Sequence, residues 1–329
     1  MKLATNDVTV SVEPQANVPL TASQRRWVKF RRQLPFYVMA AIPVVYFILF
    51  KYWPMFGVAI AFQDYKIGAA FLSLDAKWVG FKWFKQLITG PFFGRLVKNT
   101  LAISFWNIAL IFPMSILMAL MLNEIRHKKL KGFTSNLSLL PHFISTVVIV
   151  GVVVNLFSVD DGLVNQIIVA LGGERINFMA SPEWFRPLFI GSGAWQNVGF
   201  SSIVYTAAIA GIDPSLYEAA ALDGSTRVKN IFKITLPCIL PTIITMFILR
   251  VGSVMAVGYE KVLLMYNPEI YETADILSSY SYRAAFPTNG GRNNYSLSAA
   301  VSLFNSVCDL ILVIGANKVS KKISETSLW

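Results

Sequence analysis

The chain has 329 residues, of which 55% are hydrophobic and 14% charged, and its mean hydropathy is +0.54. Ordinary soluble domains contain about 25% charged residues, so this composition excludes a soluble protein and predicts an integral membrane protein. The formal net charge of +11 does not indicate a nucleic-acid partner, because an excess of Lys and Arg beside membrane spans follows from the positive-inside rule.

Residues 1–34 are predicted to form a cytoplasmic tail that is first polar and then basic. The polar part shows no hydrophobic periodicity, and the basic part, residues 25–32, contains two aromatic side chains. An arm that binds nucleic acid and an anchor at the membrane surface both fit the basic part, and the apolar run after it favours the anchor. No secretory signal pattern opens the chain, so the first apolar run is expected to be retained.

Residues 35–329 are predicted to form one all-α, polytopic membrane domain with six transmembrane helices, since a span needs about 20 apolar residues. The predicted spans are residues 35–50, 97–122, 137–157, 186–211, 239–265 and 295–316. The apolar stretch 55–62 is expected either to extend the first span or to re-enter the membrane. Six spans place both termini on one side. The larger share of Lys and Arg predicts that this side is the cytoplasm.

A polar loop, residues 213–237, separates the fourth and fifth predicted spans. Asp213 is expected to cap a short helix that begins at Pro214. Gly224 supplies a turn that a β-carbon would resist, and Pro237 is expected to close the unit. Two residues are candidates for the cap of a second helix, Ser225 and Thr226. The loop is therefore predicted to be a helix–bend–helix at the cytoplasmic membrane surface.

The spacing within this loop resembles the EAA signature of permease subunits in binding-protein-dependent ABC importers. Glu218-Ala219-Ala220 is followed after three residues by Gly224, and after nine more by Ile234, one residue and Leu236-Pro237. The resemblance implies that residues 213–237, called the coupling loop below, dock in a groove on a cytoplasmic ATPase. The implied docking positions are Glu218, Ala219, Ala220, Leu222, Asp223 and Gly224.

Further segments look like the oligosaccharide and polysaccharide branch of these permeases, and the whole is similar to the permease subunits of alginate (polyuronate) importers. They are residues 52–57, 99–101, 140–145, 258–261 and 266–268. The resemblance implies a type I ABC importer permease in the plasma (inner) membrane. It also implies several partners: a second permease subunit, expected to be a different chain, two ATPase subunits, a periplasmic or extracellular substrate-binding protein, membrane lipid and a saccharide.

No catalytic constellation is found in the sequence, so the chain is not expected to be an enzyme. There is no GxxxxGK[ST] motif, and His127 and His142 lack the spacing of metal ligands, so neither a catalytic nor a metal site is predicted. No cofactor is expected in this chain, because ATP and Mg²⁺ would bind to the partner ATPase. The alternative function is a secondary transporter or channel not driven by ATP, which would leave the coupling loop unexplained.

The fourth and fifth predicted spans contain the candidates for a substrate pathway. The fourth span is the least apolar of the six, which favours a helix that faces an aqueous path. Arg250 in the fifth span would cost about 2.5 kcal/mol or more in lipid, and helical spacing puts Lys261 on the same face. These charges either attract an acidic saccharide, or Arg250 pairs with a carboxylate or a helix-end carbonyl for structure.

Three aromatic residues could stack on sugar rings, and two amides could bind sugar hydroxyls. Packing or anchoring at the membrane interface is the alternative role of the aromatic residues. The candidates are Trp195, Tyr205 and Tyr259 for stacking, and Gln196 and Asn197 for hydrogen bonding.

Overall fold

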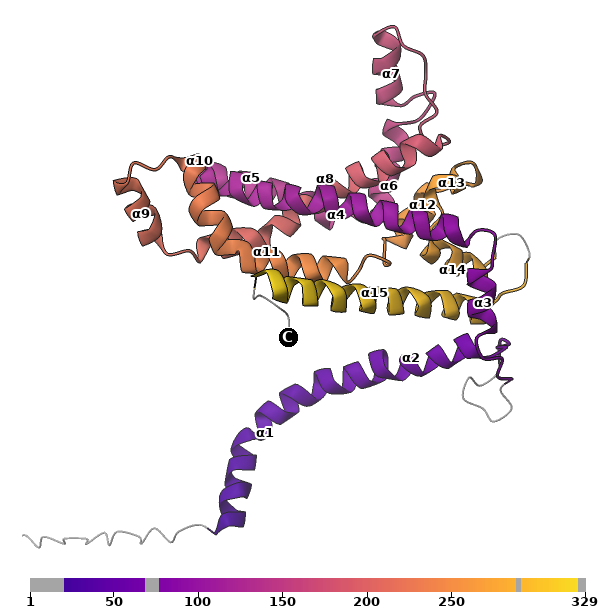
Figure 1. Ribbon diagram of the computed structural model, residues 1–329, viewed down its shortest axis with the longest axis horizontal. Helices are drawn as coiled ribbons and strands as arrows, with labels where there is room; N and C mark the ends of the chain where they lie inside the picture. The colour runs from indigo at the N-terminus through magenta and orange to yellow at the C-terminus, as the bar shows by residue number, and fades with distance from the viewer. Residues whose placement is uncertain (1–20, 69–76, 288–290, 325–329) are drawn as a thin grey trace, which may run out of the picture. The chain divides into compact units, whose positions relative to one another are not determined.

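The computed structural model describes residues 21–68, 77–287 and 291–324 (Figure 1). These residues are almost wholly helical, and the described part of the chain contains no strand beyond an isolated bridge between Gln63 and Trp78. The predicted all-α class is therefore confirmed. The chain divides into two compact units, residues 1–57 and residues 58–329, and each is considered by itself.

The first unit contains a long helical segment whose apolar side chains are exposed. It consists of α1 (Ala22–Phe47), the π-helical turn η1 (Ile48–Tyr52) and α2 (Trp53–Met55), and the 3₁₀ helix η2 (Phe56–Phe62) follows. The part that is long and apolar enough to cross a membrane is Lys29–Phe62, so the stretch 55–62 extends the first span. α1 begins inside the predicted tail, of which residues 1–20 and the side chains of Arg25 and Arg26 lie outside the description.

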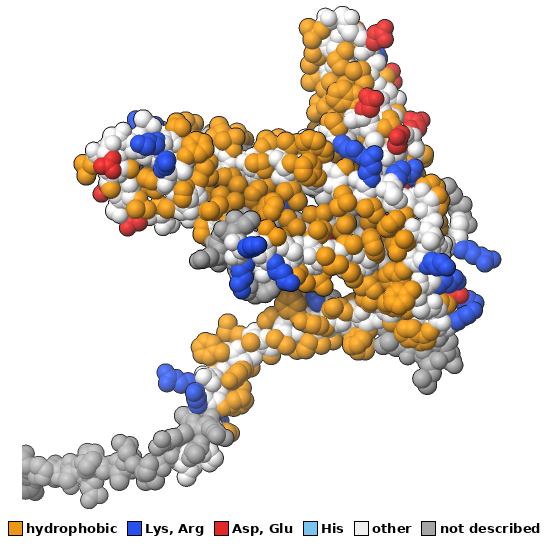
Figure 2. All heavy atoms as spheres, in the orientation of Figure 1, with side chains coloured by type: hydrophobic (Ala, Val, Ile, Leu, Met, Phe, Trp, Pro, Cys, Tyr) orange, Lys and Arg blue, Asp and Glu red, His pale blue; other side chains and the backbone are white. Residues whose placement is uncertain are grey.

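The second unit is built on four long helices that run side by side (Figure 1). They are α4 (Phe93–Glu124), α8 (Pro182–Ala210), α11 (Leu236–Val251) and α15 (Tyr295–Ser324). α4 packs along α8, and α15 packs along α11 and against the short helix α3 (Lys82–Ile88). Hydrophobic side chains cover much of the long helices (Figure 2), as expected for surfaces that face lipid or another membrane subunit.

The third predicted span, residues 137–157, is not one straight helix. α5 (Lys128–Leu139) passes into the 3₁₀ turn η3 (Leu140–Phe143), and α6 (Thr146–Leu156) leaves at an angle of 94°. Ser145 has extended backbone and caps α6, since its hydroxyl accepts a hydrogen bond from Val148 N at 3.4 Å. The break lies at Ile144 and Ser145, whose backbones are both extended, whereas Leu140 before Pro141 is still helical.

The end of α5 is fixed against α8 by a close approach at Gly199. A β-carbon at this position would lie 2.0 Å from the Ser138 carbonyl oxygen, so only glycine fits. The bend therefore rests on a contact between segments that are distant in sequence.

The fifth predicted span, residues 239–265, is wrong at both ends. The helix begins as α10 (Arg227–Asn230), continues through the π-helical turn η4 (Ile231–Thr235) and ends with α11 at Val251. Pro237 therefore lies within a continuous helix, in the first turn of α11 after the π-helical turn, and does not close the coupling loop. Residues 252–258 form a break, and a separate helix, α12 (Tyr259–Met265), follows it.

Neighbouring helices stabilise the break after Val251. Gly252 approaches α15 so closely that a β-carbon would lie 2.3 Å from Val313 Cγ2. The Asp309 carboxylate accepts a hydrogen bond from Met255 N at 2.8 Å, and the Ser104 hydroxyl donates one to the Val254 carbonyl. Two backbone groups of the break, the Met255 N–H and the Val254 carbonyl, are thus paired with side chains of neighbouring helices.

The structure confirms only part of the six predicted spans. Four helices of the described residues are long and apolar enough to cross a membrane, or five if α5 and α6 form one bent span. The remaining predicted span is α8, which has 29 residues but carries many polar side chains. The sequence predicted this helix to be the least apolar.

The segment after α12 folds against the ends of α4 and α8. It contains the 3₁₀ turn η5 (Pro268–Ile270), α13 (Tyr271–Ala274) and α14 (Leu277–Ala285). A polar group fastens it there, called the Asp275 cluster and made of Asp275, Arg95, Arg186, Arg283 and Asn99.

The Asp275 cluster joins three helical elements through buried polar contacts. Both oxygens of the Asp275 carboxylate, which is 2% exposed, lie 2.7 Å from Arg283 Nη2, and Arg95 Nη2 is 3.7 Å from one of them. Asn99 donates to the carbonyls of Glu272 and Asp275 at 2.9 Å and accepts from Arg186 at 2.9 Å. α4, α8 and the α13–α14 segment are therefore held together at one end of the bundle.

Candidate functional site

The coupling loop forms the helix–bend–helix that the sequence predicts. α9 (Pro214–Leu222) begins directly after Asp213, whose carboxylate accepts a hydrogen bond from Ser215 N at 2.9 Å and so has a lowered pKa. Gly224 has φ +67°, and Ser225 N donates to the Ala220 carbonyl at 2.9 Å, which is a glycine-based helix end. Of the two candidate caps of the second helix, Thr226 is the one observed.

Apolar side chains of the coupling loop are exposed together. No residue of α9 is buried, and Leu222 is 92% exposed. In the second helix, Val228 and Phe232 are each 64% exposed. The predicted docking positions Glu218, Ala219, Asp223 and Gly224 are exposed as well, and Ala220 is half-buried. The loop thus presents a rigid apolar surface that nothing in the described chain covers.

One contact that fixes α9 was not found from the sequence. The hydroxyl groups of Tyr217 and Thr235 lie 2.9 Å apart, and Thr235 is 3% exposed. This hydrogen bond ties α9 to the π-helical turn η4, so the position of α9 is set by the helix that leads into the membrane. Each residue alone is unremarkable, and only the fold brings the pair together.

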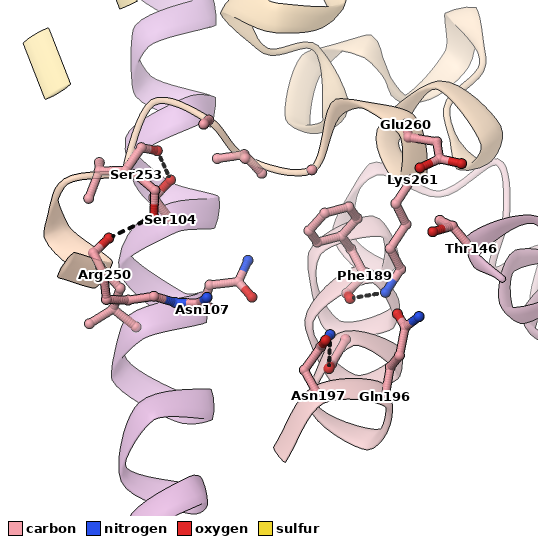
Figure 3. Close-up of a pocket in the computed structure, with 16 residues that line it drawn as sticks. Ser104, Asn107, Thr146, Phe189, Gln196, Asn197, Arg250, Ser253, Glu260 and Lys261 are labelled. Carbon is pink, nitrogen blue, oxygen red and sulfur yellow. Dashed lines mark hydrogen bonds between the residues drawn. The ribbon is translucent and has the colours of Figure 1, made fainter. Parts of the chain in front are cut away.

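A second feature of the bundle is a cavity of about 250 Å³ between α4, α8, the end of α11 and α12. Arg250 and Asn107 lie on one side of it, and Lys261, Gln196 and Asn197 lie on the other (Figure 3). The lining residues are Ser104, Asn107, Ile108, Thr146, Phe189, Gly193, Gln196, Asn197, Arg250, Ser253, Val254, Ala256, Val257, Gly258, Glu260 and Lys261.

Three of the six predicted pathway residues line this cavity, and three do not. Gln196, Asn197 and Arg250 line it. Trp195 is 54% exposed in a separate apolar groove between α6 and α8, because adjacent residues of a helix point about 100° apart. Tyr205 is 2% exposed and packs edge-on against Phe112, and Tyr259 is 52% exposed at the start of α12. For these three the structure favours packing or surface positions.

The two cavity amides are held by the bend between α5 and α6. Asn197 donates to the Gly193 carbonyl at 3.0 Å, and its side-chain oxygen lies 3.3 Å from His142 Nδ1. His142 in turn stacks on Phe200, with the ring centroids 3.8 Å apart. Gln196 donates to the Ile144 carbonyl at 3.2 Å. The bend that the sequence did not predict therefore orients two of the predicted residues.

Lys261 reaches the cavity by a route that helical spacing did not predict. Because the helix ends at Val251, Arg250 and Lys261 do not share a helical face, yet both line the cavity. Lys261 is 7% exposed, its Nζ donates to the Phe189 carbonyl at 2.9 Å and lies 4.9 Å from the Phe189 ring centroid. In the described ranges neither cation forms an ion pair, and the lining contains one carboxylate, Glu260, so its net charge is positive.

The polar residues that α4 contributes to the cavity were not among the candidates. Ser104 and Asn107 are three positions apart, so they lie on one face of a helix whose other residues there are mostly apolar. The spacing of these two polar residues in an otherwise apolar span is the feature of the sequence that could have identified them as cavity residues. Thr146 is the first residue of α6 and Ser253 lies in the break after α11, and neither carried a comparable signal.

The comparisons with known proteins agree with the resemblance. Residues 111–322 match the family model described as binding-protein-dependent transport system inner membrane component. The chain is 43% identical to the polygalacturonan/rhamnogalacturonan transport system permease protein YteP of Bacillus subtilis (strain 168), over 93% of this chain and 94% of that protein. It is 39% identical to Protein LplB of the same organism, over 89% and 90% of the two chains.

Solved structures show the same likeness. A chain of a bacterial ABC transporter involved in the import of the acidic polysaccharide alginate superposes with a TM-score of 0.81 at 40% identity, over 91% of this chain and 99% of that one. A chain of a bacterial alginate ABC transporter in complex with a periplasmic protein that holds an alginate pentasaccharide gives a TM-score of 0.82 at 39% identity, over 92% and 100%. The chain therefore belongs to the family of binding-protein-dependent transport system inner membrane components and is a permease component of a sugar ABC importer.

Proposed function

We propose that this permease imports an acidic oligosaccharide or polysaccharide in an ATP-driven importer, and that the cavity between α4, α8, α11 and α12 is part of its path. The observation that carries the proposal is the positive cavity lining, in which Arg250 and Lys261 have no carboxylate partner in the described residues. A sugar carboxylate would supply the missing charge at either cation.

The remaining lining residues suit the rest of such a substrate. Sugar hydroxyls both donate and accept hydrogen bonds, and the amides of Asn107 and Gln196 and the hydroxyls of Ser104 and Ser253 can do the same. The relatives agree with this chemistry, because their descriptions name polygalacturonan/rhamnogalacturonan and the acidic polysaccharide alginate, which contain uronic acids. We infer a substrate of the uronate-containing class.

The coupling loop is proposed to receive movement from ATPase subunits. Its exposed apolar face, centred on α9, fits a groove on a soluble partner, and its caps make the short helix rigid before any partner binds. One chain carries one such loop, so a two-fold ATPase dimer would engage a second permease subunit, which we expect to be a different chain. ATP and Mg²⁺ would bind to the ATPases, and both termini of this chain would lie in the cytoplasm with the loop.

A transport assay of an Arg250→Gln variant tests the acidic substrate. In proteoliposomes that contain the full importer, the variant is expected to lose at least tenfold in uptake of an oligouronate, while its yield stays normal. Arg292→Gln is the matched control, because Arg292 is exposed and lies outside the cavity. Unchanged uptake by Arg250→Gln would remove the cavity from the path.

An ATPase assay of an Ala219→Trp variant tests the coupling loop. The bulky side chain on the predicted docking face is expected to abolish stimulation of ATP hydrolysis by loaded binding protein without preventing insertion. Ala221→Trp is the matched control, since Ala221 is also exposed on α9 but points about 200° away from Ala219. Full stimulation of the Ala219→Trp importer would contradict the docking role.

A further inference from the structure

The helix α5 and the turn after it carry an apolar stripe that faces away from the bundle. Ser135 and Ser138 line a groove against α8, so their side of α5 is packed. On another side, exposed apolar residues follow one another at intervals of three or four positions, which is the spacing of one helix face. These residues, called the α5 stripe, are Leu130, Phe133, Leu137 and Leu140, which are 53%, 66%, 53% and 59% exposed. The rest of the described chain leaves the stripe uncovered.

A group of basic side chains precedes the stripe. Arg126, Lys128 and Lys129, called the basic cluster, are exposed, and none of them forms an ion pair among the described residues. Glu124 is the one carboxylate in the sequence from residue 122 to residue 138. The first turn of α5 contains no acidic side chain, so its lysines face the positive end of the helix dipole without compensation from the chain. An anion from outside the chain would relieve this repulsion.

The basic cluster lies at the membrane boundary, on the side of the coupling loop. α4 is long and apolar enough to cross a membrane and ends at Glu124, directly before the cluster. Leu122, near that end, lines the same groove as Ala210, the last residue of α8 before the chain enters the coupling loop. α5 therefore starts at the end of the bundle that carries α9 (Figure 1).

The length of the α5 stripe matches one leaflet of a bilayer. From Leu130 to Leu140 a helix advances about 15 Å, which is half of a hydrocarbon core about 30 Å thick. The bend at Ile144 and Ser145 follows directly after the stripe. Charge followed by apolar surface is also the order of groups in a phospholipid, so a lipid with its headgroup at the basic cluster would have its acyl chains along the stripe.

We propose that the basic cluster and the α5 stripe bind an anionic phospholipid of the leaflet on the side of the coupling loop. The headgroup phosphate accepts hydrogen bonds from Arg126, Lys128 and Lys129, and the acyl chains lie on the stripe. The positive-inside rule explains why basic residues gather on one side, but it requires no bound lipid once the chain has inserted. The site is separate from the proposed saccharide path, since none of its residues lines the cavity.

Native mass spectrometry of the complete purified importer, titrated with phosphatidylglycerol or with phosphatidylcholine, tests the proposal. The wild type is expected to bind the anionic phosphatidylglycerol at least tenfold more tightly than phosphatidylcholine. The double variant Lys128→Gln/Lys129→Gln is expected to lose at least tenfold in affinity for phosphatidylglycerol, because each basic residue near an anionic lipid adds to the attraction. Phe133→Gln/Leu137→Gln is expected to weaken binding severalfold, because it removes apolar contact with the acyl chains.

Lys131→Gln is the matched control for the single variant Lys129→Gln. Both variants lose one positive charge near the start of α5, so they have the same effect on net charge. Lys131 is half-buried and shares the packed face of α5 with Ser135 and Ser138, whereas Lys129 is exposed. Lys129→Gln should weaken the binding of phosphatidylglycerol severalfold, and Lys131→Gln should leave it unchanged.

Three results would overturn the proposal. Wild-type affinity of Lys128→Gln/Lys129→Gln, or equal binding of the two lipids by the wild type, would show that the headgroup charge is not recognised. Equal weakening by Lys129→Gln and Lys131→Gln would show that binding follows net charge alone. Loss of a partner subunit from the purified Phe133→Gln/Leu137→Gln importer would show that the α5 stripe is a contact between proteins.

Discussion

The charged side chains of the Asp275 cluster and of the cavity differ in their partners. In the cluster, Arg283 and Arg95 contact one carboxylate directly, and Arg186 joins it through Asn99. In the cavity, Lys261 is 7% exposed with a carbonyl and an aromatic ring as its partners, and Arg250 has no ion pair among the described residues. Each arginine of the cluster has a polar partner within the chain, although Arg95 Nε, Arg186 Nε and Arg283 Nη1 have none. No carboxylate pairs with the cations of the cavity in the described residues, as the proposed path for an acidic ligand requires.

This difference follows from the cost of charge in a poorly solvated place. A buried ion without a partner is expensive, so a structural site satisfies its charges with short, well-aligned contacts such as the 2.7 Å contacts between Arg283 and Asp275. A transport site cannot do so, because an internal carboxylate would compete with the substrate. Substitutions in the cluster should therefore reduce stability, and substitutions in the cavity should reduce transport.

The largest effect on stability is expected for the Asp275→Asn variant. The change leaves Arg283 and Arg95 next to a neutral amide inside the bundle, which should lower the free energy of unfolding by about 3–5 kcal/mol. Denaturant or thermal unfolding of the purified permease measures this, with the exposed Asp161→Asn as the control. An unfolding midpoint equal to that of the control would mean that the Asp275 cluster does not stabilise the fold.

A smaller loss is expected for Arg283→Lys. Lysine keeps the positive charge but lacks the planar guanidinium, which also lies 4.8 Å from the Tyr271 ring centroid. The free energy of unfolding should fall by about 2 kcal/mol, within the range of one charge-assisted hydrogen bond. The exposed Arg292→Lys should show no change. Equal stability of both variants would show that charge alone suffices at position 283.

The smallest effect on stability, and a clear effect on transport, is expected for Lys261→Met. Methionine has a similar length and removes a buried charge that has no carboxylate partner, so stability should stay the same or rise. Uptake of an oligouronate should fall severalfold, whereas ATPase activity in detergent without binding protein should persist. If Lys261→Met lost as much stability as Asp275→Asn, Lys261 would have a structural role like that of the Asp275 cluster. The proposed difference between the cavity and the cluster would then be wrong.

Local signals in the sequence were sufficient for most of the coupling loop, although Pro237 does not close it and the second cap was left open between Ser225 and Thr226. The cap at Asp213, the turn at Gly224 and the second cap at Thr226 each depend on neighbours within a few residues, and the structure contains all three. The family was predicted from the same stretch and is confirmed by the matches to known permeases. The docking role of its residues stays a prediction.

The path of the fifth span could not be predicted in the same way. Its end at Val251 depends on the close approach of Gly252 to Val313 and on the hydrogen bond from Met255 N to Asp309, both of which join segments far apart in the sequence. The same break carries Lys261 to the cavity. Arg250 was singled out because a charge in an apolar stretch is costly wherever the chain goes. Tyr205 and Tyr259 do not line the cavity, since residue type alone does not tell which way a side chain faces.

The uninterrupted helix from the coupling loop into the membrane has a mechanical consequence. Arg227–Val251 is a single rod of 25 residues, about 37 Å long, with the loop at one end and Arg250 at the other. A tilt of about 10° around the loop end would displace Arg250 by roughly 6 Å, enough to remove it from a ligand held by the opposite wall. The widened turn at Ile231–Thr235 lies near the fulcrum, where an irregular turn bends most easily.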